Sequence, residues 1–395
     1  MHVPLHATVD GVLPEIVALR HELHQHPEIR FEERWTSDRV ARFLDEAGVP
    51  YERGYAKGTG IVATLRGGEG RTVLLRADMD ALEIQEETGL PYASTIPNRM
   101  HACGHDGHTA CLCGVAKTLA QHRDSIRGTV KFVFQPAEEE AAGGRFIVEE
   151  GVLDDVDASF ALHGWPTIPA GRIGLRSGWT MAGADIFKIT VKGKACHGAD
   201  PGAGVDPIVV AAHITTALQS VISRELNPWD TGVVTVAKIH AGSATNIIPA
   251  SAVLEGTFRS LTSEVRDTIE RAIRRIAEKT AEAHRAEAEV YVSETRYPPL
   301  YNNEATTAFV REIAESVLGR EGVIDLPYPY MGAEDFAFYL QKTPGTFIWL
   351  GVNPNPAEPY PSLHNPRYNF SDEAIAPAVR LMSNIALRYL DSPPA

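Results

Sequence analysis

The 395-residue chain has little cysteine, with residues 103, 111, 113 and 196 as its four examples. So few cysteines in so long a chain do not make a disulfide framework, and this usage is typical of a reducing compartment. No stretch approaches the ~20 apolar residues that a membrane span requires, and residues 1–10 lack the basic and apolar segments of a signal peptide. We therefore expect a cytoplasmic protein that does not enter a membrane.

Positive charge is also scarce. The chain has 37 basic and 51 acidic residues, a formal net charge of −14. This balance disfavours nucleic acids and anionic membrane surfaces as partners, although a small anionic substrate can still bind a locally positive site. The sequence contains no glycine-rich phosphate loop of the P-loop or dinucleotide-binding type and no internal repeat. Since 395 residues are too many for one compact core, two domains are expected.

One short stretch, residues 100–109, is rich in potential metal ligands. It offers Cys103 and His105, followed by Asp106 and His108, and thiolate, imidazole and carboxylate groups bind transition-metal dications. The apolar spacing that follows predicts a helix from about Asp106, which places Cys103 and His105 in the turn before it. The alternative is a buried cysteine and a capping aspartate without a metal.

Several predicted strands carry a polar group at their carboxyl end. Continuous apolar runs, typical of strands buried on both faces, occur at residues 60–65, 72–80, 128–136 and 158–163. In open α/β sheets the ligand crevice lies outside the carboxyl ends of the strands. We therefore expect the polar groups at or just after these strand ends to lie close to Cys103 and His105. These groups are Asp80, Glu138, Glu139 and His163.

A second group of histidines lies in a predicted helical pair over residues 11–48. His21, His24 and His26 could form another metal cluster, since His21 and His24 can share a helix face. Pro27 and Glu28 interrupt the pattern, so capping and packing roles are favoured.

The pattern changes near residue 185. Strands at 185–191, 232–236, 252–258 and 288–293, with helices at 207–224 and 264–285, follow the β-α-β-β-α-β order of the ferredoxin-like split unit. We expect residues 185–295 to form a separate domain inserted into a first domain made of residues 1–184 and 296–395. Helices at 305–318 and 375–389, a loop leading into a helix at 332–340, a strand at 345–351 and a loop with His364 complete the first domain.

These residue types point to hydrolysis. If they bind metal, five mixed ligands suit two ions ~3.5–4 Å apart, and a water held between them would ionise near neutral pH. Adjacent Glu138 and Glu139, expected at an extended strand end, would point to opposite sides, so one can bind metal while the other acts as general base. The alternative is a solvated charge run. The ligand set considered is Cys103, His105, Glu139, His163 and His364, the last of which stands alone in its loop.

The inserted domain offers further polar groups. His197 lies in a glycine-rich turn and could donate to an oxyanion, Asn246 lies in another turn, and Arg259 at a strand end could grip a carboxylate. Ordinary turn residues and a surface arginine are equally good interpretations. Cys196 and His197 could also be a metal site, but the sequence shows no partners for them.

The chain resembles the amidohydrolase branch of the M20 metallopeptidases, which includes hippurate hydrolases, N-acyl-amino-acid deacylases and auxin-conjugate hydrolases. The matching segments are residues 76–82, 100–109, 135–140, 163–165, 197–201 and 331–336. The resemblance implies a zinc-peptidase-like α/β catalytic domain whose inserted ferredoxin-like domain is a lid that also forms a homodimer or higher homo-oligomer. Other M20 branches have a His-x-Asp metal motif where this chain reads Ala77 to Asp80, which favours Cys103 as the replacement ligand and leaves Asp80 as a supporting residue.

The resemblance also assigns roles to individual residues. It implies two divalent ions (Mn, Zn, Ni or Co) held by Cys103, His105, Glu139, His163 and His364. It further implies Glu138 as base, His197 as oxyanion donor, and Asn246 and Arg259 as substrate-carboxylate contacts. We expect a metal-dependent amidohydrolase that splits N-acyl amino acids into a carboxylate and a free amino acid. A dipeptidase or carboxypeptidase-type enzyme, or a non-catalytic binding protein on the same fold, remains the alternative.

Overall fold

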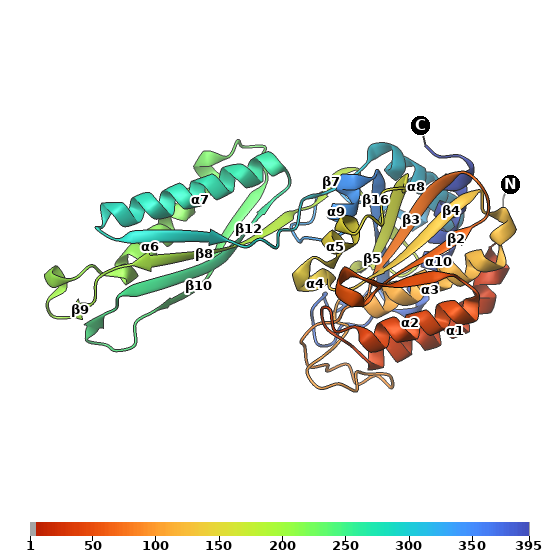
Figure 1. Cartoon of the computed structure of the whole chain (residues 1–395), viewed down its shortest axis with the longest axis horizontal. Coiled ribbons are helices and arrows are strands. Elements are labelled where there is room, and N and C mark those ends of the chain that lie inside the picture. The colour runs from red at the N-terminus through yellow and green to blue at the C-terminus, as the bar shows by residue number, and fades with distance from the viewer. Residues whose placement is uncertain (1–4, 395) are drawn as a thin grey trace. The chain divides into compact units, whose positions relative to one another are not determined.

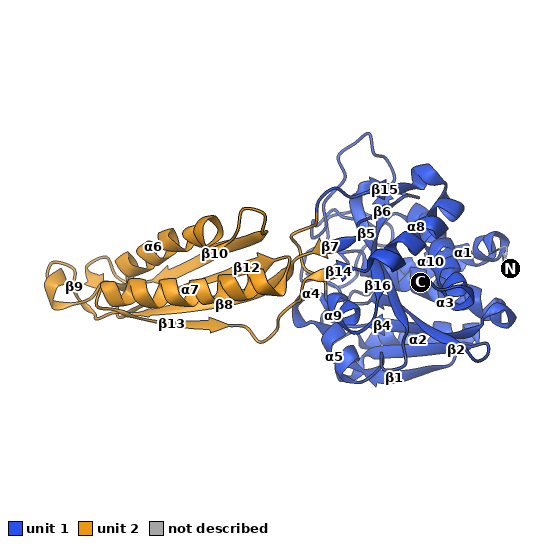
Figure 2. Ribbon diagram, turned by 90° about the horizontal axis from the view of Figure 1, so that it is seen from above, with its two compact units in different colours: residues 1–178, 301–328, 335–395 blue, residues 179–300, 329–334 orange. Residues whose placement is uncertain are grey.

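The computed structural model describes residues 5–394 and divides the chain into two compact units (Figure 2). Unit 1 takes in the chain up to residue 178, residues 301–328 and the chain from residue 335 onward. Unit 2 comprises residues 179–300 and 329–334. The expectation that residues 1–10 do not form a signal peptide falls partly on residues 1–4, which lie outside the described residues. No helix of the described chain is both long enough and apolar enough to cross a membrane.

An eight-stranded mixed sheet forms the centre of unit 1, with strand order β1-β2-β4-β3-β5-β16-β6-β15 (Figure 1). Its four central strands, β4, β3, β5 and β16, run parallel, whereas β2 and β6 pair antiparallel with β4 and β16. The strand bounds are β1 (Tyr51–Tyr55), β2 (Gly60–Arg66), β3 (Arg71–Asp78), β4 (Gly128–Gln135), β5 (Ala158–Pro169), β6 (Ile173–Leu175), β15 (Val323–Asp325) and β16 (Gly345–Asn353).

The helices of unit 1 cover this sheet. Helices α1, α2, α3, α8 and α10 share one apolar core with the sheet, and α3 is so deeply enclosed that every residue from 101 to 116 is buried. Helices α5 and α9 pack on each other, and Figure 1 shows them on the other side of the sheet. The helix bounds are α1 (His6–Gln25), α2 (Arg34–Ala47), α3 (His105–Gln121), α4 (Glu138–Ala141), α5 (Gly143–Glu149), α8 (Glu304–Leu318), α9 (Ala337–Lys342) and α10 (Ile375–Asp391).

Unit 2 is a ferredoxin-like domain. Its antiparallel sheet has strand order β10-β12-β8-β13, and its elements follow the chain order β8-α6-β10-β12-α7-β13. Alternating residues of the strands face α6 and α7 and form a separate apolar core. The bounds are β8 (Gly183–Lys192), β9 (Cys196–His197), α6 (Pro207–Leu218), β10 (Gly232–Ala241), β11 (Ile247–Ile248), β12 (Ser251–Ser260), α7 (Ser263–Ala283) and β13 (Glu287–Val292). Strands β7 (Gly178–Met181) and β14 (Leu300–Asn302) pair with each other where the chain passes from one unit to the other.

This architecture confirms the predicted fold class, an α/β domain carrying a ferredoxin-like domain. Strand β5 and helix α6 differ from expectation in their extent. Strand β5 continues through His163 as far as Pro169, because it keeps pairing with β16 beyond Gly164. Helix α6 ends at Leu218 and is followed by a π-helical turn over Val221–Glu225.

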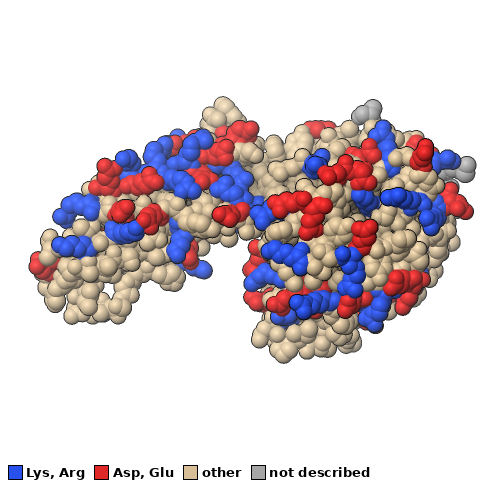
Figure 3. All heavy atoms as spheres, viewed as in Figure 1, with Lys and Arg blue, Asp and Glu red and all other residues tan. Residues whose placement is uncertain are grey.

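Acidic and basic side chains are interspersed over the face drawn in Figure 3. Exposed pairs occur in both units, such as Arg53 with Asp38 at 2.5 Å in unit 1 and Lys279 with Glu282 at 2.7 Å in unit 2. Each exposed pair contributes about 0–1 kcal/mol to stability. On this face the net negative charge is therefore distributed and does not form one acidic patch.

Candidate metal centre

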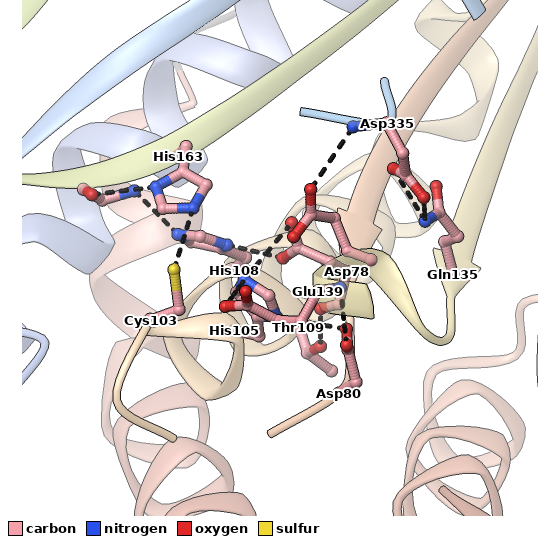
Figure 4. A network of polar contacts seen from close by, with 12 residues as sticks. Asp78, Asp80, Cys103, His105, His108, Thr109, Gln135, Glu139, His163 and Asp335 are labelled. Carbon is pink, nitrogen blue, oxygen red and sulfur yellow. Dashed lines mark hydrogen bonds and ion pairs between the residues drawn. The ribbon is translucent and has the colours of Figure 1, made fainter. Parts of the chain in front are cut away.

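The five ligand candidates of the sequence come from separate elements of unit 1, and the structure brings them together. Cys103 precedes α3, which begins at His105. Glu139 lies in α4, His163 in β5 and His364 in the loop before α10. Figure 4 shows Cys103, His105, Glu139 and His163 pointing toward a common space.

Strand register explains part of this convergence. Asp78, the last residue of β3, pairs with Gln135, the last residue of β4. On the other side of β3, Arg76 pairs with Ala161 of the parallel strand β5. Two residues further along both strands, Asp78 is therefore level with His163. The parallel central strands therefore deliver polar groups to one edge of the sheet, as the strand pattern predicts.

Two groups of potential ligands share one carboxylate. Cys103, Glu139 and His364 offer atoms within 4.8 Å of one another, and so do His105, Glu138 and Glu139. Oε1 of Glu139 lies 3.1 Å from Nε2 of His364 and 4.0 Å from Nε2 of His105. Sγ of Cys103 lies 3.4 Å from Nε2 of His163. A carboxylate between two ligand groups suits a pair of ions with a bridging ligand.

The histidine nitrogens fit this interpretation. Nδ1 of His163 donates to the carbonyl oxygen of Gly164 at 2.9 Å, so the lone pair of the neutral ring lies on Nε2, which faces Cys103. Nδ1 of His105 donates to Asp80, and among the described residues its buried Nε2 has no hydrogen-bond partner. A buried nitrogen without a partner is costly unless something binds it. Thiolate, imidazole and carboxylate together suit a divalent transition metal.

Burial and neighbouring charges change the ionisation of these groups. Burial, and then the charge of Glu139, raises the pKa of the Cys103 thiol well above its ordinary value. Burial also lowers the pKa of His163 well below its ordinary value, which keeps that ring neutral. Burial by itself would raise the pKa of the Asp78 carboxyl, but the charges of His105 and Arg76 hold that pKa well below its usual range. A bound cation would favour the Cys103 thiolate.

Asp80 connects two of the ligand candidates. Its Oδ1 accepts a hydrogen bond from Nδ1 of His105 at 3.2 Å, and its Oδ2 accepts the backbone N–H of Glu139 at 3.0 Å. Both carboxylate oxygens are therefore engaged in holding neighbouring residues. This arrangement sets the orientation of the His105 ring and the position of α4 relative to it.

The expected extended geometry at Glu138 and Glu139 is wrong, because both residues lie in the one-turn helix α4. The turn is flanked by Ala137 and Ala142, whose φ angles of 58° and 51° fall in the left-handed region. Such conformations cost ~1–3 kcal/mol each and persist where surrounding contacts impose them. Here the backbone N–H of Ala137 donates to Glu33 at 2.9 Å, and that of Gly143 donates to the Ala137 carbonyl at 2.9 Å.

Glu138 and Glu139 nevertheless diverge, since consecutive helical side chains are ~100° apart. Oε1 of Glu138 accepts the backbone N–H of Asp335 at 3.3 Å, and its side chain is buried. A carboxylate oxygen of Glu138 also lies within 4.8 Å of the His105 and Glu139 ligand atoms. Glu138 is therefore held beside the ligand groups by a different contact from those of Glu139.

Sequence reasoning missed a buried polar network behind the site. Asp78 contacts Nδ1 of His108 at 2.6 Å and the guanidinium of Arg76 at 2.6 Å, and Arg76 reaches Asp335 at 2.6 Å. Gln135 donates to the same Asp335 carboxylate at 2.7 Å. The available signal was Arg76 inside an otherwise apolar strand, because a buried arginine requires acidic partners.

The three histidines at the carboxyl end of α1, which are His21, His24 and His26, do not converge. Nδ1 of His24 lies 2.9 Å from Asp106, whereas Nε2 of His21 lies 2.8 Å from Asp372. His26 contacts the carbonyl of Glu22 at 2.8 Å. Their separate partners agree with the capping and packing roles that the sequence favoured. Asp106 also accepts from Arg20 at 2.8 Å, so this carboxylate faces α1.

The other three candidates lie in unit 2. His197 of β9 pairs with Ile247 of β11, which directly follows Asn246. The backbone N–H of Ala199 donates to Nδ1 of His197 at 3.1 Å, so the neutral ring carries its proton on Nε2. Arg259 lies in β12, and burial lowers its pKa against the opposing charge of Asp185.

Comparison with known proteins identifies the family. The profile of "Peptidase family M20/M25/M40" matches residues 74–388. The chain is 39% identical over 378 residues to N-acetylcysteine deacetylase of Bacillus subtilis, which covers 95% of this chain and 97% of that protein. It is 38% identical over 378 residues to IAA-amino acid hydrolase ILR1-like 4 of Arabidopsis thaliana, covering 95% and 86%.

A solved structure agrees with these sequence relationships. The YxeP protein of Bacillus subtilis, described as a dinuclear metal binding peptidase from the M20 family, has a TM-score of 0.83 and 35% identity to this chain. The similarity covers 97% of this chain and 99% of that one. Together with the shared carboxylate between two ligand groups, these comparisons show that the chain belongs to the M20 metallopeptidase family, in its amidohydrolase branch.

Proposed function

We propose that this protein hydrolyses the amide bond of N-acyl amino acids, releasing a carboxylate and a free amino acid. The observation that carries the proposal is the position of Glu139 between His364 and His105, with the buried Glu138 carboxylate beside it. The two relatives support the substrate class, since one is named for deacetylating N-acetylcysteine and the other for hydrolysing IAA–amino acid conjugates. Acetyl, benzoyl or similar acyl groups are the substrates to test.

The metal ligands would be the five convergent residues of unit 1, which are Cys103, His105, Glu139, His163 and His364. Two divalent ions bound there, with Mn, Zn, Ni and Co as candidates, would polarise the substrate carbonyl and lower the pKa of a bound water. Asp80 supports this centre by holding the His105 ring and the Glu139 backbone. The mixed thiolate, imidazole and carboxylate donors are compatible with each of these metals.

Glu138 would act as the general base and then the general acid. Its carboxylate, held by the N–H of Asp335, takes a proton from the attacking water and passes it to the nitrogen of the departing amino acid. Because the side chain is buried, bulk water competes little for that proton. Its position beside the Glu139 and His105 ligand atoms supports this role.

Three residues of unit 2 would contact the substrate. His197 carries its proton on Nε2, the tautomer that can donate to an oxyanion. Asn246 and Arg259 would bind the substrate carboxylate, for which a guanidinium offers two parallel hydrogen bonds. We further propose that residues 185–295 act as a lid that forms a homodimer or higher homo-oligomer. A cytoplasmic location is consistent with the four cysteines, all of which are free.

Release of free amine from a substrate panel tests the proposal. The panel contains N-acetyl and N-benzoyl amino acids and matched dipeptides, assayed with manganese-loaded protein and with protein kept in chelator. We expect chelator-sensitive turnover of the acylated amino acids. Turnover of dipeptides alone would identify the alternative, a dipeptidase or carboxypeptidase-type enzyme. Absence of turnover with metal bound would indicate a binding protein, although binding alone does not require a buried carboxylate in the position of Glu138.

A further inference from the structure

Both ring nitrogens of His108 are engaged, one with each of two different elements (Figure 4). Nε2 accepts the backbone N–H of Gly164 in β5 at 2.7 Å. Nδ1 lies 2.6 Å from Oδ1 of Asp78 at the end of β3. A backbone N–H can only donate, so Nε2 must be the unprotonated nitrogen and Nδ1 carries the proton. Asp78 is ionised beside Arg76 and accepts that proton's hydrogen bond.

This tautomer argues against a metal role for His108. Four buried residues, Asp78, His105, His108 and His163, offer ligand atoms close enough for an ion. However, the only lone pair of the neutral His108 ring is already directed at the Gly164 N–H. Binding an ion through Nε2 would leave that buried N–H without its acceptor.

The Gly164 backbone in turn orients His163, because the two peptide groups that flank its Cα each contact one histidine ring. Its carbonyl accepts from Nδ1 of His163 at 2.9 Å, which fixes the ring so that Nε2 faces Cys103. Phe370 lies against this segment, since a Cβ on Gly164 would come within 3.1 Å of its ring. The rings of His108 and His163 also meet edge to face, with centroids 4.5 Å apart. The Gly164 backbone, held at its N–H by His108 and at its carbonyl by His163, therefore has little freedom to move.

We propose that His108 is a positioning residue that directs Nε2 of His163 toward the metal centre by holding the peptide N–H of Gly164. The inference rests on the proposed function in one respect, the role of His163 as a ligand. It adds that the essential part of His108 is an acceptor at Nε2, and that the contact with Asp78 serves to fix the tautomer.

Two isosteric substitutions separate these contacts. In His108→Gln the side-chain oxygen falls near the position of Nε2 and can accept the Gly164 N–H. In His108→Asn the amide nitrogen falls near Nδ1 and can donate to Asp78, but no acceptor reaches Gly164. His122→Asn is the control, because His122 lies just beyond the other end of α3 and contacts Thr8 at 2.8 Å.

The measurement is Co²⁺ binding to metal-free protein, followed by visible absorption and by competition with a chelator. Thermal unfolding of the metal-free proteins provides the fold control. We expect His108→Asn to bind Co²⁺ about 10–100-fold more weakly with an altered spectrum, whereas His108→Gln stays within a few-fold of the parent protein. His122→Asn should match the parent protein. If His108→Asn does not fold, His108→Leu, which also lacks the acceptor, takes its place.

Equal Co²⁺ affinities and spectra for the Asn, Gln and parent proteins would overturn the inference. An equal loss in the Asn and Gln proteins that follows their unfolding temperatures would also overturn it, because it would show a general packing role. His163→Ala separates the inference from the proposed function. If this variant retains two metal equivalents, the ligand assignment fails and the positioning role fails with it. If it loses metal while His108→Asn does not, only the positioning role fails.

Discussion

Asp80 and His105 are joined by a 3.2 Å contact between Oδ1 and Nδ1, and the second oxygen of Asp80 accepts the Glu139 N–H at 3.0 Å. Asp80 thus holds the first residue of α3 and the short helix α4 in a fixed relation. The same contacts orient two of the proposed metal ligands.

Replacing Asp80 should therefore weaken metal binding. We expect Asp80→Ala to lower affinity by about 10–100-fold, because the His105 ring and the α4 backbone lose their common acceptor. Isothermal titration with Mn²⁺ measures the effect, and excess metal should restore part of the activity. Glu83→Ala is the matched control, since exposed Glu83 lines the same small pocket as Asp80. Unchanged affinity in Asp80→Ala would contradict the role given to these contacts.

Substitution of the proposed base should affect chemistry and leave metal content intact. Glu138→Gln keeps the shape of the side chain and its contact with the Asp335 N–H but cannot take a proton. We expect kcat to fall by about 10²–10⁴-fold with two metal equivalents still bound, measured by amine release and elemental analysis. Glu140→Gln, in the same turn but paired with Arg30 on the surface, should be nearly unaffected. An active Glu138→Gln enzyme would exclude the proposed mechanism.

The stability of the protein should depend on pH through Glu33. Burial, and then the charge of Asp80, raises the pKa of Glu33 from 4.5 to about 8. The native state therefore keeps a proton that the unfolded chain releases, so this group's contribution is fully present below pH 4.5 and is lost as the pH rises through 8.

Glu33→Gln keeps a neutral side chain at every pH, so its unfolding temperature should fall less than that of the parent protein between pH 5 and 9. The difference should be on the order of a few °C. Thermal unfolding of metal-free protein across this range measures it. Glu32→Gln, at the neighbouring exposed position, should follow the parent protein. Parallel pH profiles for the parent and Glu33→Gln proteins would show that Glu33 is ionised in both states.

Gly107 should not tolerate a side chain. A Cβ at this position would lie 2.4 Å from the ring of Phe370, which is fully buried. We expect Gly107→Ala to lower the free energy of unfolding by about 1–3 kcal/mol. Gly11→Ala, on exposed helical surface with nothing within 4 Å, should instead stabilise by about 0.4–1 kcal/mol. Urea unfolding of metal-free protein gives both values. A neutral Gly107→Ala would show that Phe370 can move aside.

Much of the fold followed from local pattern. Continuous apolar runs predicted β3 and β4, and the β-α-β-β-α-β order of the expected strands and helices predicted the ferredoxin-like arrangement of unit 2. These signals are reliable because the apolar residues that form the buried face of a strand or helix recur within a few positions of one another. The turn at Glu138 was missed because Ala137 and Ala142 adopt left-handed conformations that distant residues impose, among them Glu33.

The sequence by itself determined which segments carry ligand chemistry, because Cys103 and His105 are two residues apart and the chain alone keeps them close. Only the tertiary structure decided which of the 15 histidines share a site. The sequence around His364 does not indicate a metal ligand, yet its Nε2 lies 3.1 Å from Glu139. In contrast, His21 contacts Asp372 and His24 contacts Asp106. The tautomer of His108 was likewise decided by strand β5, which supplies the Gly164 N–H. Such contacts arise from packing between elements far apart in the chain, and periodicity within one element does not encode them.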